Sequence, residues 1–283
     1  MMPIQKKISK HPDASFLHPR EREHQAHYRA YLFGPFRLLY KDVPIEKQMR
    51  RRSKAGELLK WFLLNPGKLI SADEFLDRFW PDISAETALC SLHVSIHYLR
   101  HLLQPELKTR QESKYIRRRP NNFYWFEIDE TWWADTIDVP HLFDTARKFE
   151  QSGDDIKASF YYRKVISYCS LGFLPENTAE EWLEPYLRLY GYIYSQALQC
   201  MIQICTQRGE LEDAMEYAYQ ALAVDPYCEP ATKAIIDVHL QQGNISAASR
   251  TLNDFSDFFQ QTLGVGLGRD LRLLRDRIIE AAD

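Results

Sequence analysis

A short pattern recurs three times in the second half of the chain and limits the folds available to that half. Each copy has Gln, any residue and Gly, followed five residues later by Ala, and two of the copies stand 34 residues apart. Arrays of helical hairpins have such a period, with Gly in the inter-helix turn and Ala where the helices pack closest. The first copy lies 56 residues before the second, so we expect extra length near Leu171–Pro175. The copies are Gln151-Ser152-Gly153 with Ala158, Gln207-Arg208-Gly209 with Ala214, and Gln241-Gln242-Gly243 with Ala248.

The first half shows a different order of signals. Alternating apolar residues predict short strands at 31–40, and the Ser71-Ala72-Asp73-Glu74 capping box predicts a helix that ends at Trp80-Pro81. A helical run around Leu58–Leu63 precedes it, and Ser84 can cap a third helix that reaches Leu103. The pattern of residues 115–126 predicts a β-hairpin around Pro120-Asn121-Asn122. Strands, three helices and a hairpin predict an α+β winged helix.

Charge divides the chain at about the same place. Residues 1–130 hold 23 Lys and Arg against 16 Asp and Glu, whereas residues 131–283 hold 13 against 23. Such asymmetry points to a nucleic-acid or membrane-facing module joined to a second module. We therefore expect a flexible, basic and polar tail at 1–29, a winged helix at 30–130, and an all-α repeat domain at 131–283.

The third predicted helix has two distinct faces. Ala88, Leu92, Ile96, Leu99 and Leu103 form a narrow apolar stripe that can bury against the other helices. The opposite face offers hydrogen-bond donors and a small apolar contact, which a helix needs to read base edges in a major groove. An ordinary solvated face is the alternative, and a zinc site is a further one because two of the imidazoles are one turn apart. The candidate recognition residues are His93, Val94, His97, Tyr98, Arg100 and His101.

Two basic clusters accompany this helix. Binding to duplex phosphates needs several cations spread along one surface, because each neutralised phosphate releases counterions. One cluster precedes the first helix, and the other stands in the predicted hairpin with two asparagines at its tip. The candidate phosphate-binding residues are Arg50, Arg51, Arg52 and Lys54 in the first cluster and Arg117, Arg118, Arg119, Asn121 and Asn122 in the second.

Ordered stretches of the sequence resemble a known family. Residues 31–130 resemble the OmpR-like winged-helix domain, and 31–280 resemble the SARP-type bacterial regulators. In these regulators a bacterial transcriptional activator domain of tetratricopeptide-like helices follows the winged helix. The stretches that carry the resemblance include Leu32–Phe36, Arg51–Ala55, Asn65–Ser71, Phe79–Asp82, Ser91–Arg100, Gly172–Pro175, Trp182, Asp225-Pro226, Glu229 and Leu263-Gly264.

The resemblance implies a sequence-specific regulator of transcription that binds double-stranded DNA at repeated promoter sites. It implies Ala85–Leu103 as the recognition helix, Ile116–Phe126 as the wing, a homodimer on DNA, and an activator that contacts RNA polymerase or another protein through its repeats. The chain departs from the family at Tyr98 and His101, where Arg or Lys is usual, and at the end of the wing, where Asn122-Phe123-Tyr124 replaces the usual Gly-Tyr pair.

Other function classes have weaker support. A protein-interaction scaffold, whose winged helix binds protein rather than DNA, fits the acidic repeats. An enzyme is not expected, because the cluster Glu180, Glu181 and Glu184 has the spacing of a solvated helix face and no phosphate loop or nucleophile elbow accompanies it. We expect no cofactor and no resident metal. Five Cys without a CxxC pair and the lack of a long apolar run predict reduced thiols in a cytoplasmic protein without a membrane partner.

Overall fold

A computed structural model describes residues 19–51, 53–264 and 266–282, and the chain divides into two compact units. The first unit comprises the described part of Met1–Leu32 together with Phe36–Asp138, and the second comprises Phe33–Pro35 and Val139–Asp283. The division falls after Asp138, inside helix α5 (Asp135–Gln151), and therefore later than residue 130. In the second unit, Phe33 packs edge-on against Tyr190, with ring centroids 4.9 Å apart.

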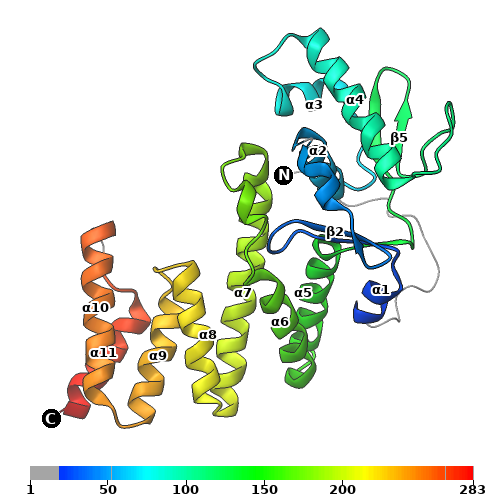
Figure 1. The fold of residues 1–283 in the computed structure, drawn as a ribbon. Coiled ribbons are helices and arrows are strands. Elements are labelled where there is room, and N and C mark those ends of the chain that lie inside the picture. Colours follow the sequence, from blue (N-terminus) through cyan, green and yellow to red (C-terminus); the bar gives the residue numbers. More distant parts are fainter. Residues whose placement is uncertain (1–18, 52, 265, 283) are drawn as a thin grey trace. The chain divides into compact units, whose positions relative to one another are not determined.

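The first unit has the α+β winged-helix architecture expected from the sequence (Figure 1). One sheet has the strand order β3-β2-β1-β7, with β1 antiparallel to β2 and parallel to β7, and the other has the order β4-β6-β5. The helices of this unit are α1 (Pro19–Gln25), η2 (Glu46–Arg51), α2 (Ser53–Leu64), α3 (Ala72–Phe79) and α4 (Ala85–Leu103). The strands are β1 (Tyr28–Tyr31), β2 (Arg37–Tyr40), β3 (Val43–Pro44), β4 (Ile70–Ser71), β5 (Ile116–Arg119), β6 (Phe123–Phe126) and β7 (Trp132–Ala134).

Regular structure begins earlier than the sequence suggested. Helix α1 and the first residues of β1 fall within 1–29, the range expected to be a tail, while residues 1–18 lie outside the described part of the chain. Tyr28 stacks on Trp132, with ring centroids 4.4 Å apart, and the two residues pair across β1 and β7. The partner that orders this stretch therefore lies about a hundred residues away in the chain, where local pattern cannot reveal it.

The predicted stripe of α4 forms the centre of the winged-helix core. Leu92 and Leu99 are fully buried, and the five stripe residues named above are the buried residues of this helix. Phe75 of α3 packs against Phe62 of α2, with ring centroids 5.2 Å apart. The predicted N-cap of α3 is confirmed, because Ser71 Oγ accepts a hydrogen bond of 3.1 Å from the Glu74 backbone N–H.

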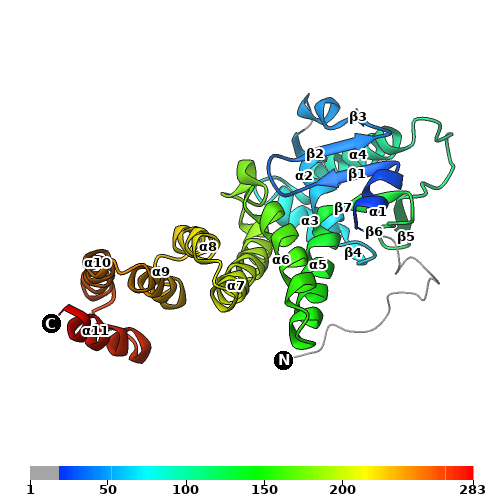
Figure 2. The ribbon, with the colours of Figure 1, turned by 90° about the horizontal axis from the view of Figure 1, so that it is seen from below.

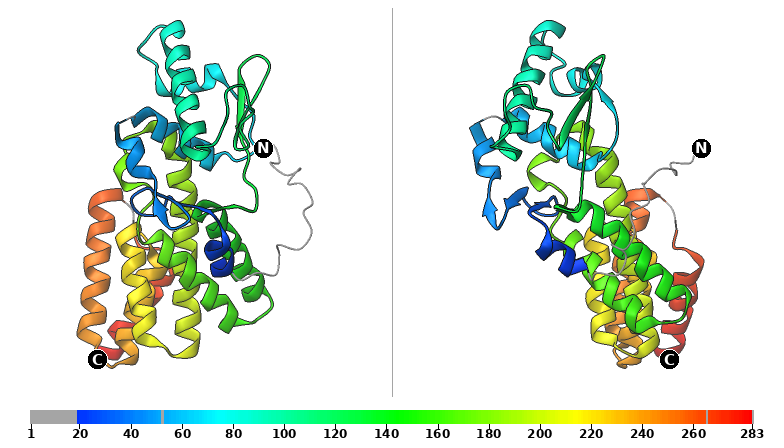
Figure 3. Two further views of the ribbon diagram at one scale, coloured as in Figure 1. Left: turned by 45° about the vertical axis from the view of Figure 1, so that its right-hand side comes forward. Right: turned by 90° about the vertical axis from the view of Figure 1, so that its right-hand side faces the viewer.

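The predicted hairpin is confirmed as β5 and β6, and it lies beside α4 (Figure 3). Arg118 pairs with Tyr124 and Arg119 with Phe123 in its register. Its tip has left-handed backbone at Asn121 (φ 63°) and Asn122 (φ 56°), a conformation that Asn tolerates better than most residues. The Ala72 N–H donates a hydrogen bond of 2.9 Å to the Asn122 carbonyl, which ties the tip to the start of α3.

The second unit is the expected array of helical hairpins, seen nearly end-on in Figure 2. Gly153, Gly209 and Gly243 stand in the three inter-helix turns with φ between 72° and 76°, a left-handed conformation that favours glycine at a helix end. Ala158, Ala214 and Ala248 are fully buried, as expected where two helices approach most closely. The helices are α5, α6 (Asp155–Cys169), α7 (Glu184–Arg208), α8 (Leu211–Val224), α9 (Glu229–Gln241), α10 (Ile245–Leu263) and α11 (Arg269–Ala282).

The longer offset between the first two copies has two structural sources. The connection after α6 contains the 3-10 helices η3 (Pro175–Asn177) and η4 (Glu181–Leu183), close to the predicted insertion. In addition, α7 has 25 residues, whereas α9, which occupies the same place in the next hairpin, has 13. Among the described residues, a membrane-spanning helix is not found, since every helix is too short or too polar.

Candidate nucleic-acid interface

The outer face of α4 carries polar and small apolar side chains, as its predicted role requires. His93 and His97 are exposed, and Val94 between them has 58% of its surface accessible. Cys90 is exposed one turn before Val94. The face therefore offers two imidazoles and an aliphatic side chain to a ligand, opposite the buried stripe that fixes the helix in the fold.

Two other residues of the predicted set are held by the protein itself. The half-buried Arg100 donates a hydrogen bond of 2.9 Å from Nε to the carbonyl of Ile116 in β5. The Tyr98 hydroxyl donates one of 2.7 Å to the carbonyl of Gln48 in η2. Burial lowers the pKa of Arg100, and the charge of Arg118 lowers it further. These two side chains fasten α4 to the elements on either side of it.

The histidines of α4 differ in their surroundings. His97 and the half-buried His101 face each other edge-on, with ring centroids 4.5 Å apart. Partial burial lowers the pKa of His93, and the charge of Arg118 acts in the same direction. A lowered pKa keeps His93 neutral at pH 7, so its imidazole offers one donor and one acceptor, which suits a base edge better than a phosphate.

The three arginines of the hairpin do not form a single edge, because side chains alternate along a strand. Arg118 bonds the Asn122 side chain, and its charge acts on His93 and Arg100 of α4. Arg117 and Arg119 belong to the other face of β5, where the Arg119 guanidinium lies 5.3 Å from the centroid of the Trp125 ring. All three side chains are exposed.

The basic cluster before α2 is described only in part. Lys54 is exposed in the first turn of α2, and the backbone of Arg50 and Arg51 belongs to η2. Arg52 lies outside the described residues.

A basic hollow adjoins this face, and sequence reasoning missed two of its residues. The hollow has a volume of about 730 Å³ and lies between the C-terminal half of α4, residues 107–113 and β5. Lys108 and Arg110 line it together with His97, His101 and the hairpin arginines. The two missed residues stand in a loop without periodicity, so their charge was the only signal in the sequence.

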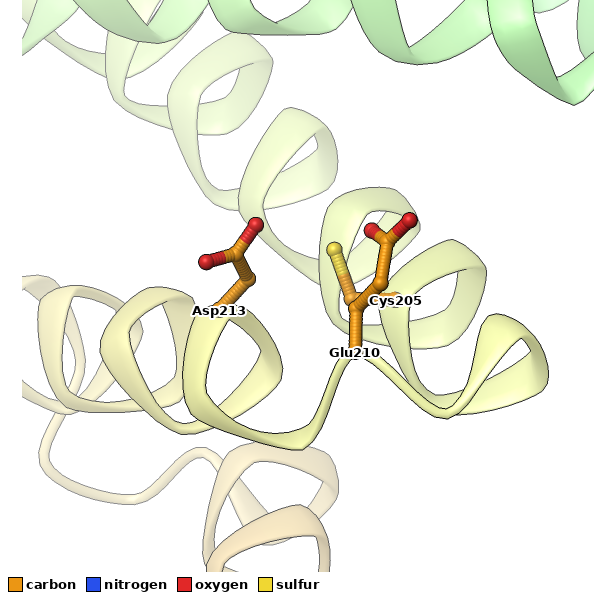
Figure 4. A group of neighbouring side chains, drawn as sticks. All are labelled: Cys205, Glu210 and Asp213. Carbon is orange, nitrogen blue, oxygen red and sulfur yellow. The ribbon is translucent and has the colours of Figure 1, made fainter.

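One cluster of metal-ligand types lies far along the chain, in the turn between α7 and α8. Cys205, Glu210 and Asp213 point toward one another there, with ligand atoms within 4.8 Å (Figure 4). Arg208 lies 3.8 Å from the Glu210 carboxylate, and Arg163 lies 4.0 Å from that of Asp213. Burial, with Glu210 and Asp213 beside it, raises the pKa of Cys205 to about 11. Each carboxylate has an arginine partner, so contacts within and beside the turn account for this cluster.

Comparisons with known proteins assign both halves of the chain to regulator domains. The family "Transcriptional regulatory protein, C terminal" matches residues 46–124, and "Bacterial transcriptional activator domain" matches residues 170–279. No curated protein sequence matches the chain. A solved structure of Mycobacterium tuberculosis EmbR in complex with a low-affinity phosphopeptide is similar, with a TM-score of 0.74 and 17% sequence identity. That match covers 90% of this chain and 65% of the EmbR chain, and it supports the fold.

Proposed function

Because the chain belongs to the SARP-type bacterial regulators, in which an OmpR-like winged helix precedes a transcriptional activator domain, we propose that it binds specific promoter sites in double-stranded DNA. One observation carries the proposal: α4 buries its apolar stripe and leaves His93, Val94 and His97 exposed on the opposite face. A helix presented in this way can enter a major groove and read base edges.

The roles of the surrounding residues follow from their contacts. His93 and His97 read bases, and Val94 can contact a thymine methyl group. Arg117, Arg119 and Lys54 neutralise phosphates, since they are exposed cations on elements next to α4. Asn121 and Asn122 at the hairpin tip approach the neighbouring minor groove. Tyr98 and Arg100 position α4 through the hydrogen bonds described above rather than touching bases.

The proposal is tested by selecting bound duplexes from a random pool with the full chain. A recurring site is expected, and repeated sites at a fixed spacing would report a dimer on DNA. Titration of the selected duplex at several salt concentrations is expected to give a steep fall of log K with log salt, with the site preferred over bulk DNA. Equal affinity for all duplexes, or none at low salt, contradicts the proposal.

The helical unit supplies the second part of the proposed function, contact with RNA polymerase or another protein during activation. A groove of about 490 Å³ between α7 and α9 suits this part. It is lined by Gln196, Gln199, Gln203 and Gln207, and amide side chains at this spacing can bond the backbone of an extended segment.

The protein-interaction scaffold remains the second candidate function, and the same groove favours it. DNA binding by the wild-type chain and the effect of Gln203→Ala combined with Gln207→Ala separate the two candidates. For an activator, the wild type binds DNA, and the variant keeps that affinity but loses activation of a reporter in vitro with purified polymerase. For a scaffold, the wild type binds no DNA, and the variant loses only its protein partner.

A further inference from the structure

The basic hollow beside α4 has the size of a small-molecule site. Its volume of about 730 Å³ falls within the range of about 300–1,000 Å³ that ligand pockets occupy. Three separate elements wall it, namely α4, the loop 107–113 and β5. A hollow walled by three elements can offer polar groups from each of them to one ligand.

The loop wall of the hollow is held by its own side chains. Gln104 Oε1 accepts hydrogen bonds of 2.7 Å from both the Ser113 hydroxyl and the Lys114 N–H. Ser113 is buried, and its hydroxyl accepts a 3.2 Å bond from the Ile116 N–H at the start of β5. These bonds join both ends of the loop, so Lys108 and Arg110 are carried on a defined turn.

The charge that lines the hollow is strongly one-sided. Six guanidinium or ammonium groups line it against the single carboxylate of Glu112, counting the described lining residues, and the imidazoles of His97 and His101 add further donors. Arg117 and Arg119 line it from β5, with the Arg117 guanidinium 3.9 Å from the Glu127 carboxylate, and Lys108 and Arg110 line it from the loop. Cations that surround one concavity from two walls suit a multiply charged anion.

Like charges that line one hollow cost free energy in the absence of an anion. Burial is the first cause of the lowered pKa of Arg100 in this lining, and the charge of Arg118 adds to it. A bound anion removes this repulsion, and a ligand that binds only the folded chain raises its stability. We therefore expect an anion bound in the hollow to raise the stability of the folded chain.

We propose that this hollow is a phosphate-binding site, in which Lys108, Arg110, Arg117 and Arg119 donate to phosphate oxygens. The phosphate can come from the backbone of bound DNA or from a small phosphorylated molecule. Supply of the phosphate by the DNA backbone rests on the proposed function, whereas binding of a small phosphorylated molecule does not. Guanidinium groups bond two phosphate oxygens at once, which makes phosphate a better ligand than a halide.

The test uses pyrophosphate as the probe and the thermal midpoint of the full chain as the readout, at ionic strength held constant with NaCl. The wild-type midpoint is expected to rise and saturate with pyrophosphate. Lys108→Gln combined with Arg110→Gln should abolish the rise, while the charge-matched control Arg269→Gln with Arg272→Gln, on exposed positions of α11, should keep it. The same rise in all three chains, or none beyond the NaCl effect, overturns the proposal.

A DNA arm distinguishes the two sources. If the DNA backbone supplies the phosphate, pyrophosphate competes with the selected duplex, and the Lys108/Arg110 variant shows a log K against log salt slope shallower by about 2. If a small molecule supplies it, that variant binds DNA normally but no longer responds to pyrophosphate. Should the loop variant unfold, Arg117→Gln with Arg119→Gln replaces it in the pyrophosphate assay. If the wild type binds no duplex, the proposed function is overturned but the phosphate site is not.

Discussion

At the scale of single residues, Arg100 illustrates how a side chain on an outward helix face becomes structural. The residue is half-buried, and its Nε bonds the carbonyl of the fully buried Ile116. Loss of a hydrogen bond to a charged group, with a buried acceptor left unpaired, costs about 1–3 kcal/mol. The contact therefore links α4 to the hairpin with an energy comparable to that of a core methyl group or two.

We expect Arg100→Lys to lower the free energy of unfolding by about 1–2 kcal/mol, although it keeps the charge, because Lys has no donor at the position of the Arg100 Nε that bonds Ile116. Urea unfolding of the variant and of the exposed control Arg272→Lys measures the difference. An unchanged urea midpoint for Arg100→Lys would show that the bond contributes nothing to stability.

The alternation along β5 leads to a second prediction at this scale. Arg117→Gln with Arg119→Gln should weaken binding to all duplexes and reduce the salt slope by about 2, since two phosphate contacts are removed. Arg118→Gln should leave the slope nearly unchanged, because Arg118 is engaged with Asn122. A slope reduced by about 1 in Arg118→Gln, half the reduction of the double variant, would place all three arginines in one role.

His97 is expected to act differently from these cations. If it reads a base, His97→Ala changes which sites are preferred, by about 1–3 kcal/mol at one position of the site. Repeating the duplex selection with the variant measures this. A uniform loss across all sequences would reassign His97 to positioning.

At the scale of elements, a glycine in a repeat turn differs from a glycine inside a helix. Gly209 ends α7 with φ of 72°, where a side chain is strained, whereas Gly191 lies inside α7, where an added methyl group would meet no atom within 4 Å. Gly209→Ala should destabilise by about 1–2 kcal/mol, and Gly191→Ala should stabilise by up to about 1 kcal/mol. Thermal or urea unfolding of the two variants checks the opposite signs, and a loss of stability in both would contradict this view of the turns.

Much of this element order could be predicted from the sequence, because periodicity and turn chemistry are local. The stripe of α4, the cap at Ser71 and the three glycine turns all rest on neighbours within a few residues. Strand β7 and helix α1 could not be predicted in this way. Tyr28 is ordered by Trp132, and the acceptors of Tyr98 and Arg100 lie on other elements, so only the tertiary fold reveals them.

At the scale of the whole molecule, charge separates the two units' expected tasks. The basic half contains the winged helix and the hollow, and the acidic half contains the repeat array. A basic surface favours association with DNA at low salt and loses that advantage as ions screen it. We expect the acidic repeat unit not to compete for the same phosphates, because like charges repel.

The reactivity of one cysteine reports whether the outer face of α4 is covered. Cys90 is exposed there, whereas Cys169, Cys205 and Cys228 are buried. Burial raises the pKa of both Cys200 and Cys205 to about 11, so at pH 7 these thiols stay protonated and react slowly. A maleimide at pH 7 should therefore label the native chain first at Cys90.

Protection of Cys90 by DNA tests the central claim most directly. The labelling rate at Cys90 is measured by mass spectrometry with and without a saturating amount of the selected duplex, and with a duplex that lacks the site as control. If α4 lies in the major groove, the selected duplex should slow labelling at least tenfold and the control should have little effect. An unchanged rate on fully bound DNA would contradict the account, because DNA would then contact some other face of the protein.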